Sequence, residues 1–404
     1  MTPNGDLLVV GAFQGTIDLG TGPLTSVSGR DAFLAKLDKN GKLVFAMSFS
    51  GTSDQVAMGV AAGADGSIFV TGQFDYSIKF GESTLAGSPN DGFITKLDPN
   101  GAHVWSHSLE GIEVTTSGLA VDQENDAVYV AGGARGLKLD GGAVLVPDSG
   151  EGDGFVVRFN GQGTLGWTAV IDGAAQSSAV AVAAHPKGGC VVTGYVAGGV
   201  KFGGAPTVPS GAVDAFVARI DATGSFAFGR VFGSDPAWQM GRAVAVKATG
   251  AAVVTGFFDG TIALAGTPTA CKGETDLFVA EFDELGKTSW ARTFGSASTE
   301  WGDGVALDSA GNAYVVGHSE GTLDFGGGEL PSSTGAALVV KLSATGTHLF
   351  SKAFQGGPGA WGRAVAADPV GSIAVAGSAE TAIDFGGGAL PGTTVDAVLA
   401  RLAQ

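Results

Sequence analysis

The chain has 404 residues, of which 44% are hydrophobic and 69 are glycine. The glycines show no three-residue period, which excludes a collagen-like chain, and no apolar run approaches the length of a transmembrane helix. The formal net charge of −17 argues against nucleic acid as a partner, because an acidic surface repels a polyanion. Two cysteines, Cys190 and Cys271, are too few for a disulfide-rich scaffold.

A repeat runs through the chain from its first residues onward. An apolar run that ends in glycine occurs seven times, and these glycines are Gly11, Gly72, Gly132, Gly194, Gly256, Gly317 and Gly377. They are spaced 60 to 62 residues apart. So constant a period, of about 61 residues, indicates a repeat architecture.

Each copy contains four strand-like segments. A small apolar segment such as 241–246 comes first, and the apolar run comes second. The third segment opens with aspartate in six copies, at Asp31, Asp91, Asp153, Asp214, Asp276 and Asp396. The fourth carries an aromatic column at Phe45, Trp105, Trp167, Phe228, Trp290 and Phe350. We interpret the aspartates as caps for backbone N–H groups, because a catalytic carboxylate is needed only once or twice.

The pattern predicts an all-β fold, because no segment keeps a helical period and short strands alternate with turn signals. Four-stranded sheets bury both faces when they stack radially. We therefore expect a seven-bladed β-propeller of four-stranded antiparallel blades, forming a single domain over residues 1–404. The first copy lacks its first strand and the last copy its fourth. We expect a closing segment of about 30 residues, N-terminal to Met1, to supply both.

Two stretches resemble a known repeat family. Residues 302–317 read Gly-Asp-Gly-Val-Ala-Leu-Asp-Ser-Ala-Gly-Asn-Ala-Tyr-Val-Val-Gly, and residues 214–224 read Asp-Ala-Phe-Val-Ala-Arg-Ile-Asp-Ala-Thr-Gly. Both are similar to the bacterial seven-bladed β-propeller repeat often called SBBP. The resemblance implies a secreted protein or lipoprotein in an extracytoplasmic setting, and it implies no known activity.

Secondary features lead to further expectations. The long connections between second and third segments, such as 321–328, predict a short extra strand in each. The basic residue five positions after the start of the third segment is predicted to be solvated or paired with a neighbouring blade, in the copies with Lys36, Lys96, Arg158, Arg219, Lys341 and Arg401, and Glu281 is the exception. We expect no disulfide, with Cys190 buried and Cys271 more accessible.

Three tryptophans break the repeat and give the candidate site. Trp238, Trp301 and Trp361 lie in the loops that enter three consecutive copies, on the face that also carries the long connections. Charged residues follow each of them, at Arg242, Asp303 and Arg363. Aromatic rings beside convergent polar groups suit a sugar or a peptide. The alternative is that these tryptophans are wedges packed between blades.

Chemistry-bearing motifs are sparse. Residues 283–290 resemble the docking repeat of quinoprotein propellers, but the polar set that would ligate the cofactor is not evident, so we predict no cofactor. The five histidines do not cluster, and we predict no metal site.

We favour a binding or scaffolding module that recognises a protein or glycan. The alternatives are a hydrolase, lyase or quinoprotein-like enzyme with a site over the central channel, and a purely structural surface protein.

Overall fold

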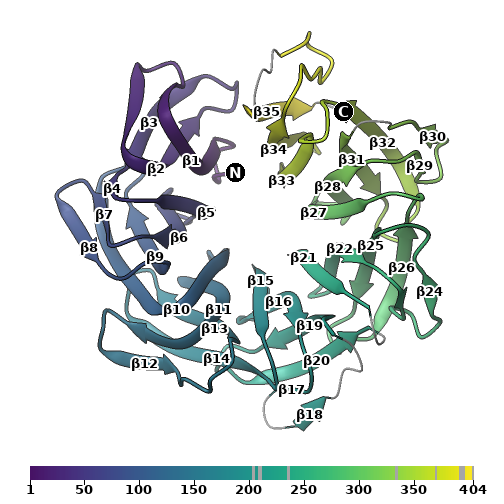
Figure 1. Ribbon diagram of the computed structural model, residues 1–404, viewed down its shortest axis with the longest axis horizontal. Helices are drawn as coiled ribbons and strands as arrows, with labels where there is room; N and C mark the ends of the chain where they lie inside the picture. The colour runs from purple at the N-terminus through teal and green to yellow at the C-terminus, as the bar shows by residue number, and fades with distance from the viewer. Residues whose placement is uncertain are drawn as a thin grey trace. The chain divides into compact units, whose positions relative to one another are not determined.

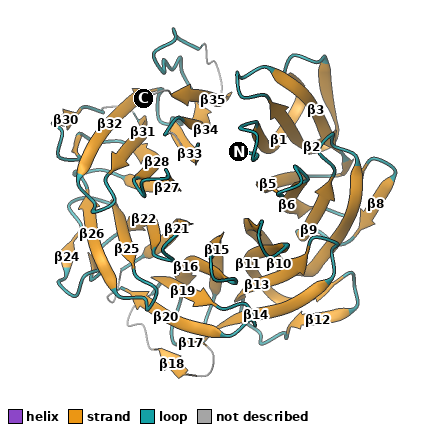
Figure 2. Ribbon diagram, turned by 180° about the vertical axis from the view of Figure 1, so that it is seen from behind, coloured by secondary structure: helices purple, strands orange, loops and turns teal. Residues whose placement is uncertain are grey.

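The computed structural model describes residues 1–202, 205–207, 212–233, 237–332, 335–368, 371–390 and 396–402. Every regular element in these ranges is a β-strand (Figure 2). None of these residues forms a helix long and apolar enough to span a bilayer. The contacts divide the chain into two compact units. Unit 1 comprises Met1–Val192, Gly199–Pro206 and Ile220–Phe226, and unit 2 comprises Thr193–Gly198, Thr207–Arg219 and Ala227–Gln404.

Unit 1 is built from antiparallel strands that pair in chain order (Figure 1). The first sheet has three strands, which are β1 (Leu7–Asp18), β2 (Pro23–Leu37) and β3 (Leu43–Phe49). The next strands are β5 (Gln55–Ala62), β6 (Ile68–Phe74), β9 (Asp91–Leu97), β10 (His103–Asp122), β11 (Ala127–Leu139), β13 (Asp153–Asn160) and β14 (Leu165–Gly173). The long strand β10 pairs first with β9 and then with β11, so it serves as the last strand of one sheet and the first of the next.

Unit 2 repeats the same order of pairing. One sheet contains β21 (Gln239–Val246), β22 (Ala252–Phe258), β25 (Asp276–Phe282) and β26 (Thr288–Phe294). A second contains β27 (Glu300–Leu307), β28 (Ala313–Ser319), β31 (Ala336–Leu342) and β32 (His348–Gln355). A third contains β33 (Trp361–Ala367), β34 (Ile373–Ala379) and β35 (Asp396–Leu402). The remaining long strands are β15 (Ser177–Ala184), β16 (Cys190–Val196), β19 (Asp214–Ile220) and β20 (Phe226–Phe232).

Short additional strands occupy the long connections of the second to sixth copies, as expected. They are β7 (Ser77–Phe80), β8 (Ser83–Ala86), β12 (Ala143–Val146), β17 (Val200–Phe202), β18 (Ala205–Thr207), β23 (Thr261–Ile262), β24 (Thr269–Ala270), β29 (Leu323–Asp324) and β30 (Glu329–Leu330). The strand β4 (Gly51–Thr52) lies instead between β3 and β5. In the last copy the described residues of this connection form only an isolated bridge, between Ile383 and Leu390. Asp324 shows why the run 326–328 is glycine-rich. Its Oδ1 accepts the N–H groups of Gly326 at 2.7 Å and Gly328 at 3.0 Å, and both glycines have φ near +104°, where a Cβ is unfavourable.

The glycine that ends each apolar run is required by the close approach of a neighbouring strand. A Cβ added at Gly132 would lie 1.7 Å from the carbonyl oxygen of Thr115, and one added at Gly256 would lie 1.9 Å from that of Met240. Gly317 and Gly377 meet the carbonyl oxygens of Trp301 and Trp361 in the same way, also at 1.9 Å. The repeated glycine therefore allows the first and second strands of a sheet to approach at this point.

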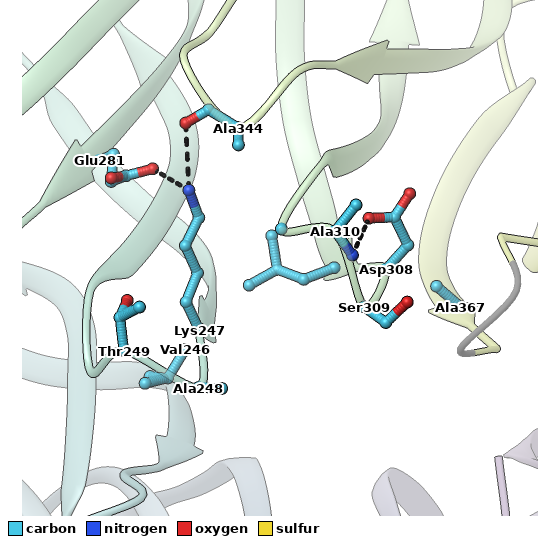
Figure 3. A pocket seen from close by; sticks show the side chains of 12 residues that line it. Val246, Lys247, Ala248, Thr249, Glu281, Asp308, Ser309, Ala310, Ala344 and Ala367 are labelled. Atoms are coloured by element: carbon cyan, nitrogen blue, oxygen red, sulfur yellow. Dashed lines mark hydrogen bonds and ion pairs between the residues drawn. The ribbon is translucent and has the colours of Figure 1, made fainter.

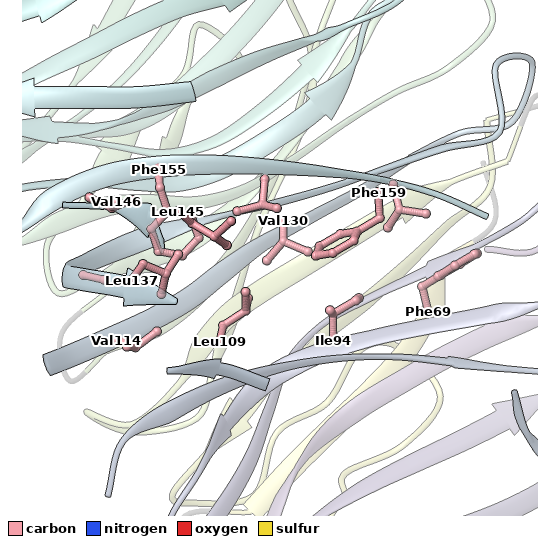
Figure 4. Packing of buried hydrophobic residues seen from close by; sticks show 13 residues of the cluster. Phe69, Ile94, Leu109, Val114, Val130, Leu137, Leu145, Val146, Phe155 and Phe159 are labelled. Atoms are coloured by element: carbon pink, nitrogen blue, oxygen red, sulfur yellow. The ribbon is translucent and has the colours of Figure 1, made fainter. Parts of the chain in front are cut away.

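The second and third strands carry the core because both of their faces are covered. In unit 1, thirteen buried residues form one cluster, among them Phe69, Val130, Phe155 and Phe159 (Figure 4). A cluster of the same kind in unit 2 includes Val253, Val315 and Val340. Strands covered on both faces read as continuous apolar runs rather than alternating ones, which explains why the second segment was the clearest marker of the repeat. Cys190 is buried and Cys271 is partly exposed, as the sequence predicted.

Candidate functional site

The structure brings all six candidate residues together in unit 2, on the neighbouring first strands β21, β27 and β33. Trp238 lies directly before β21, where it forms an isolated bridge with Val213. The sequence placed Trp301 and Trp361 in loops as well, and this was wrong. Both belong to strands, because β28 and β34 continue far enough to pair with them, at His318 and Ser378.

Each of the three charged residues lies at a β-bulge. The pairing register shifts between Gly241 and Ala243 in β21, between Gly302 and Gly304 in β27, and between Gly362 and Ala364 in β33. The extra residues at these shifts are Arg242, Asp303 and Arg363. A bulge reorients a side chain out of the regular strand alternation. The fold thus aims three charged side chains from equivalent positions of adjacent sheets.

Two arginines share one buried carboxylate. Arg242 donates from Nε at 2.8 Å, and its Nη2 lies 2.7 Å from the same Oδ1 of Asp303. The Nη1 of Arg363 lies 3.8 Å from Oδ2 of Asp303, and that oxygen is buried with no hydrogen-bond partner among the described residues. The Asp303 side chain is 2% exposed, whereas that of Arg363 is 48% exposed. Burial is the main cause that lowers the pKa of Arg363. The negative charge of Asp303 opposes this effect, and the positive charge of Arg242 adds to it. The carboxylate of Asp303 therefore balances the positive charge of Arg363 only in part.

The aromatic rings form a continuous packed row. Phe257 meets Trp238 edge-on at 5.6 Å between centroids and stacks on Trp301 at 4.6 Å. Trp301 in turn meets Trp361 edge-on at 5.1 Å. Trp301 and Trp361 are half-buried, while Trp238 is 46% exposed. Packing thus accounts for most of the surface of two tryptophans, and Trp238 offers the open ring.

The arginines join this row through their planar groups. The guanidinium of Arg363 lies 4.1 Å from the ring centroid of Trp361, and that of Arg242 lies 5.5 Å from Trp301. Guanidinium–indole contacts of this kind are attractive and hold the fork in a fixed plane. We call the six residues Trp238, Trp301, Trp361, Arg242, Asp303 and Arg363 the arginine–tryptophan surface.

Two supporting residues were missed by the sequence reasoning. His318 stacks on Trp361 at 4.0 Å between centroids, and its Nδ1 is 2.7 Å from the carbonyl oxygen of Ala360. Phe257 supports both Trp238 and Trp301. Phe257 and His318 directly follow the repeated glycine of their copies, Gly256 and Gly317. A comparison of the residue after that glycine in all copies would have marked this position, because its side chain lies beside the start of the first strand.

The repeated aspartates cap backbone groups, as predicted. Asp31 accepts the N–H of Val27 at 3.2 Å, and Asp91 accepts the N–H groups of Ser88 at 2.5 Å and Gly111 at 3.2 Å. Burial is the main cause that raises the pKa of both carboxyls, and backbone hydrogen bonds oppose it. The stretch that resembles a quinoprotein docking repeat is likewise a hairpin turn, in which Asp283 accepts the N–H groups of Leu285 and Lys287, each at 2.9 Å.

A cavity of about 630 Å³ lies at the turns that join first and second strands in unit 2, away from the arginine–tryptophan surface (Figure 3). Lys247 lines it, pairs with Glu281 and donates to the carbonyl oxygen of Ala344 at 3.1 Å. In the next sheet Lys341 pairs with Asp308 at 3.4 Å. The expected pairing with a neighbouring sheet is met by Lys36 and Lys96, which donate to the carbonyl oxygens of Pro99 and Gly161 at 3.1 and 3.0 Å. It was wrong for Lys341, because the turn of its own sheet presents the nearly buried carboxylate of Asp308 to it.

Comparison with known proteins places these observations in a family context. The beta-propeller repeat model SBBP matches residues 285–323. The regulatory protein FlaEY of Caulobacter vibrioides is 26% identical over 421 residues, and the match covers 95% of this chain but 41% of that relative. The chain thus corresponds to less than half of the relative's length.

Solved structures agree on the fold. U3-55K matches with a TM-score of 0.50 and 12% identity, covering 86% of this chain and 84% of that chain. The β-propeller domain of Cps50 (Swd1) from Myceliophteria thermophila matches with a TM-score of 0.46 and 9% identity over 86% of this chain and 88% of that chain. Together with the recurring order of pairing in the sheets, the match to U3-55K shows a β-propeller fold, and residues 285–323 of this fold match the SBBP beta-propeller repeat.

Proposed function

We propose that this β-propeller is an extracytoplasmic binding or scaffolding module, and that it recognises a protein or a glycan through the arginine–tryptophan surface. The extracytoplasmic setting follows from the resemblance to SBBP proteins. The regulatory description of the Caulobacter relative is compatible with a role in binding rather than in chemistry. Residues 1–404 are proposed to act as one propeller domain in this role.

One observation carries the proposal. Trp238 is 46% exposed although its neighbours in the aromatic row are packed, and the row leads directly to the half-exposed guanidinium of Arg363. A large exposed ring beside a polar group held in place by packing is typical of ligand contacts. A tryptophan that served only as a wedge would be buried against both neighbours.

The test compares two exposed aromatic residues of unit 2. The intact chain is screened on arrays of glycans and peptides, together with Trp238→Ala and, as a matched control, Phe350→Ala, whose ring is 45% exposed on β32. We expect Trp238→Ala to lose at least tenfold in affinity, as expected when a ring at the centre of a contact is removed. The control should bind like the parent, and both melting temperatures should stay unchanged.

The rival functions predict different results. If the chain is a purely structural protein, no glycan or peptide will be retained by the parent. If it is an enzyme, the ligand will be converted when it is held with the protein, and product will accumulate. If the parent binds a ligand and Trp238→Ala binds it equally well, the binding surface lies elsewhere and the proposal is wrong.

A further inference from the structure

The arginine–tryptophan surface carries an excess of positive charge on an otherwise acidic chain. Arg242 and Arg363 both face Asp303, so two cations are balanced by one carboxylate, in a protein with a net charge of −17. Arg242 directs two donors to Asp303, whereas the single ion contact of Arg363 among the described residues is the one at 3.8 Å. The uncompensated charge therefore resides mainly on Arg363.

We infer that the ligand of this surface is an acidic saccharide, whose carboxylate pairs with Arg363 and whose sugar ring lies against Trp238. This inference rests on the proposed function and names its ligand class. A carboxylate is the group that matches a guanidinium fork, because two parallel N–H donors meet its two oxygens. Stacking on Trp361 at 4.1 Å fixes the plane of the fork before the ligand arrives, which lowers the entropic cost of binding.

Asp303 and Arg242 act as positioning residues in this scheme. The buried carboxylate of Asp303 orients both arginines, and its negative charge is offset by the two donors of Arg242 at 2.8 and 2.7 Å. Arg242 is 27% exposed and lies over Trp301, so it adds positive potential without offering its main donors. Arg363 alone combines exposure, a fixed plane and donors that remain available.

Trp238 favours a saccharide over an acidic peptide. Its ring is 46% exposed, whereas the other rings of the row are packed edge-on or face-on, so Trp238 is the ring of this row that is most open to a ligand. The C–H face of a sugar suits such a ring, while the hydroxyl groups stay in water. An acidic peptide would also pair a carboxylate with Arg363, but it would gain less binding energy from contact with the single exposed ring of Trp238.

The experiment uses the intact chain and two matched probes, an oligogalacturonate hexasaccharide and the same hexasaccharide with its carboxyl groups reduced to alcohols. An alginate hexasaccharide and a glutamate-rich peptide complete the set. Binding is measured by calorimetry for the parent, Arg363→Gln, Arg363→Lys and Trp238→Ala. The control is Arg292→Gln, which removes an exposed arginine of β26 and leaves the arginine–tryptophan surface intact.

We expect an acidic hexasaccharide to bind at least tenfold more tightly than its reduced form, and salt to weaken it. Arg363→Gln should abolish that preference, Arg363→Lys should retain part of it, and Arg292→Gln should leave it unchanged.

Equal binding of acidic and reduced saccharides that is weakened by Trp238→Ala would overturn the inference while the proposed function stands. Binding of the peptide alone would replace the saccharide with an acidic protein. Failure of every probe, acidic and neutral, would overturn this inference. The array screen decides the proposed function separately.

Discussion

At the residue scale, Glu300 shows how one position departs from its equivalents. The first strands β5 and β21 begin with buried Gln55 and Gln239, and β27 begins with buried Glu300. Burial raises the pKa of Glu300, and the neighbouring Asp276 adds to the rise. In the folded chain the group holds its proton to a higher pH than in the unfolded chain, so its contribution to stability is present in acid and is lost as pH rises through the folded pKa.

Glu300→Gln should therefore stabilise the protein at neutral pH. The amide keeps the geometry and can exchange hydrogen bonds with Ser296, whose backbone N–H and hydroxyl now lie 2.6 Å from the carboxylate. Urea unfolding at pH 4.5 and pH 8 should show a gain at pH 8 that shrinks at pH 4.5. The reverse change, Gln239→Glu, should introduce the pH dependence. A variant that is less stable than the parent at pH 8 would contradict this account of Glu300.

A reversed ion pair in unit 2 leads to a second prediction. The usual pair joins a basic residue of the third strand to an acid of the turn, as Lys341 and Asp308 do, whereas Glu281 and Lys247 have exchanged these places. Both side chains of the reversed pair are 11% exposed. Glu281→Lys alone brings two cations together and should cost about 3 kcal/mol. Adding Lys247→Asp should recover most of that loss in urea unfolding. A double variant no more stable than the single one would show that the pair is not interchangeable.

At the element scale, the fourth strands are held by contacts between their aromatic column and the hairpin turn of the following sheet. The indole N–H groups of Trp105, Trp167 and Trp290 donate to the carbonyl oxygens of Gly161, Ala222 and Ala344, at 3.1 to 3.2 Å. Each ring also covers the glycine of that turn, which leaves no room for a Cβ. These contacts give the aromatic column of the sequence its physical meaning.

Two glycines separate backbone strain from this packing. Gly346 has φ of +76°, and an added Cβ would lie 2.6 Å from the ring of Trp290. Gly41 occupies the same turn position with φ of +83° and has no atom within 4 Å of such a Cβ. Gly41→Ala should cost about 1 kcal/mol for the left-handed backbone, and Gly346→Ala about 2 to 4 kcal/mol because the ring is displaced as well. Thermal unfolding that gave equal losses would show that the contact contributes nothing.

Elements were easier to predict than their irregularities. The period of the repeat located the second and third strands, because the apolar runs and the aspartate that opens the third segment depend on local burial and capping. The β-bulges at Arg242, Asp303 and Arg363 could not be located, since a bulge depends on the register between two strands. For the same reason Trp301 and Trp361 were assigned to loops although they lie in strands.

At the scale of the whole molecule, composition and period were sufficient for the fold class. The all-β fold is confirmed and residues 285–323 match the SBBP repeat, while the number of seven blades stays a prediction. The convergence of the six candidate residues could be anticipated because equivalent positions of a repeat recur at equivalent places. The sequence could not show that one of the six offers an exposed ring, one a buried carboxylate and one an available guanidinium. These differences depend on contacts with Phe257 and His318, which lie elsewhere in the chain.

The most direct measurement uses the six tryptophans of the chain as internal reporters. Their indole N–H signals are recorded by NMR while the saccharide or peptide retained on the arrays is added. We predict that the signal of Trp238 shifts most and those of Trp301 and Trp361 less. The signals of Trp105, Trp167 and Trp290, which are bonded to turn carbonyls, should stay in place. Shifts confined to these last three signals, with Trp238 unmoved, would contradict the claim that the arginine–tryptophan surface binds the ligand.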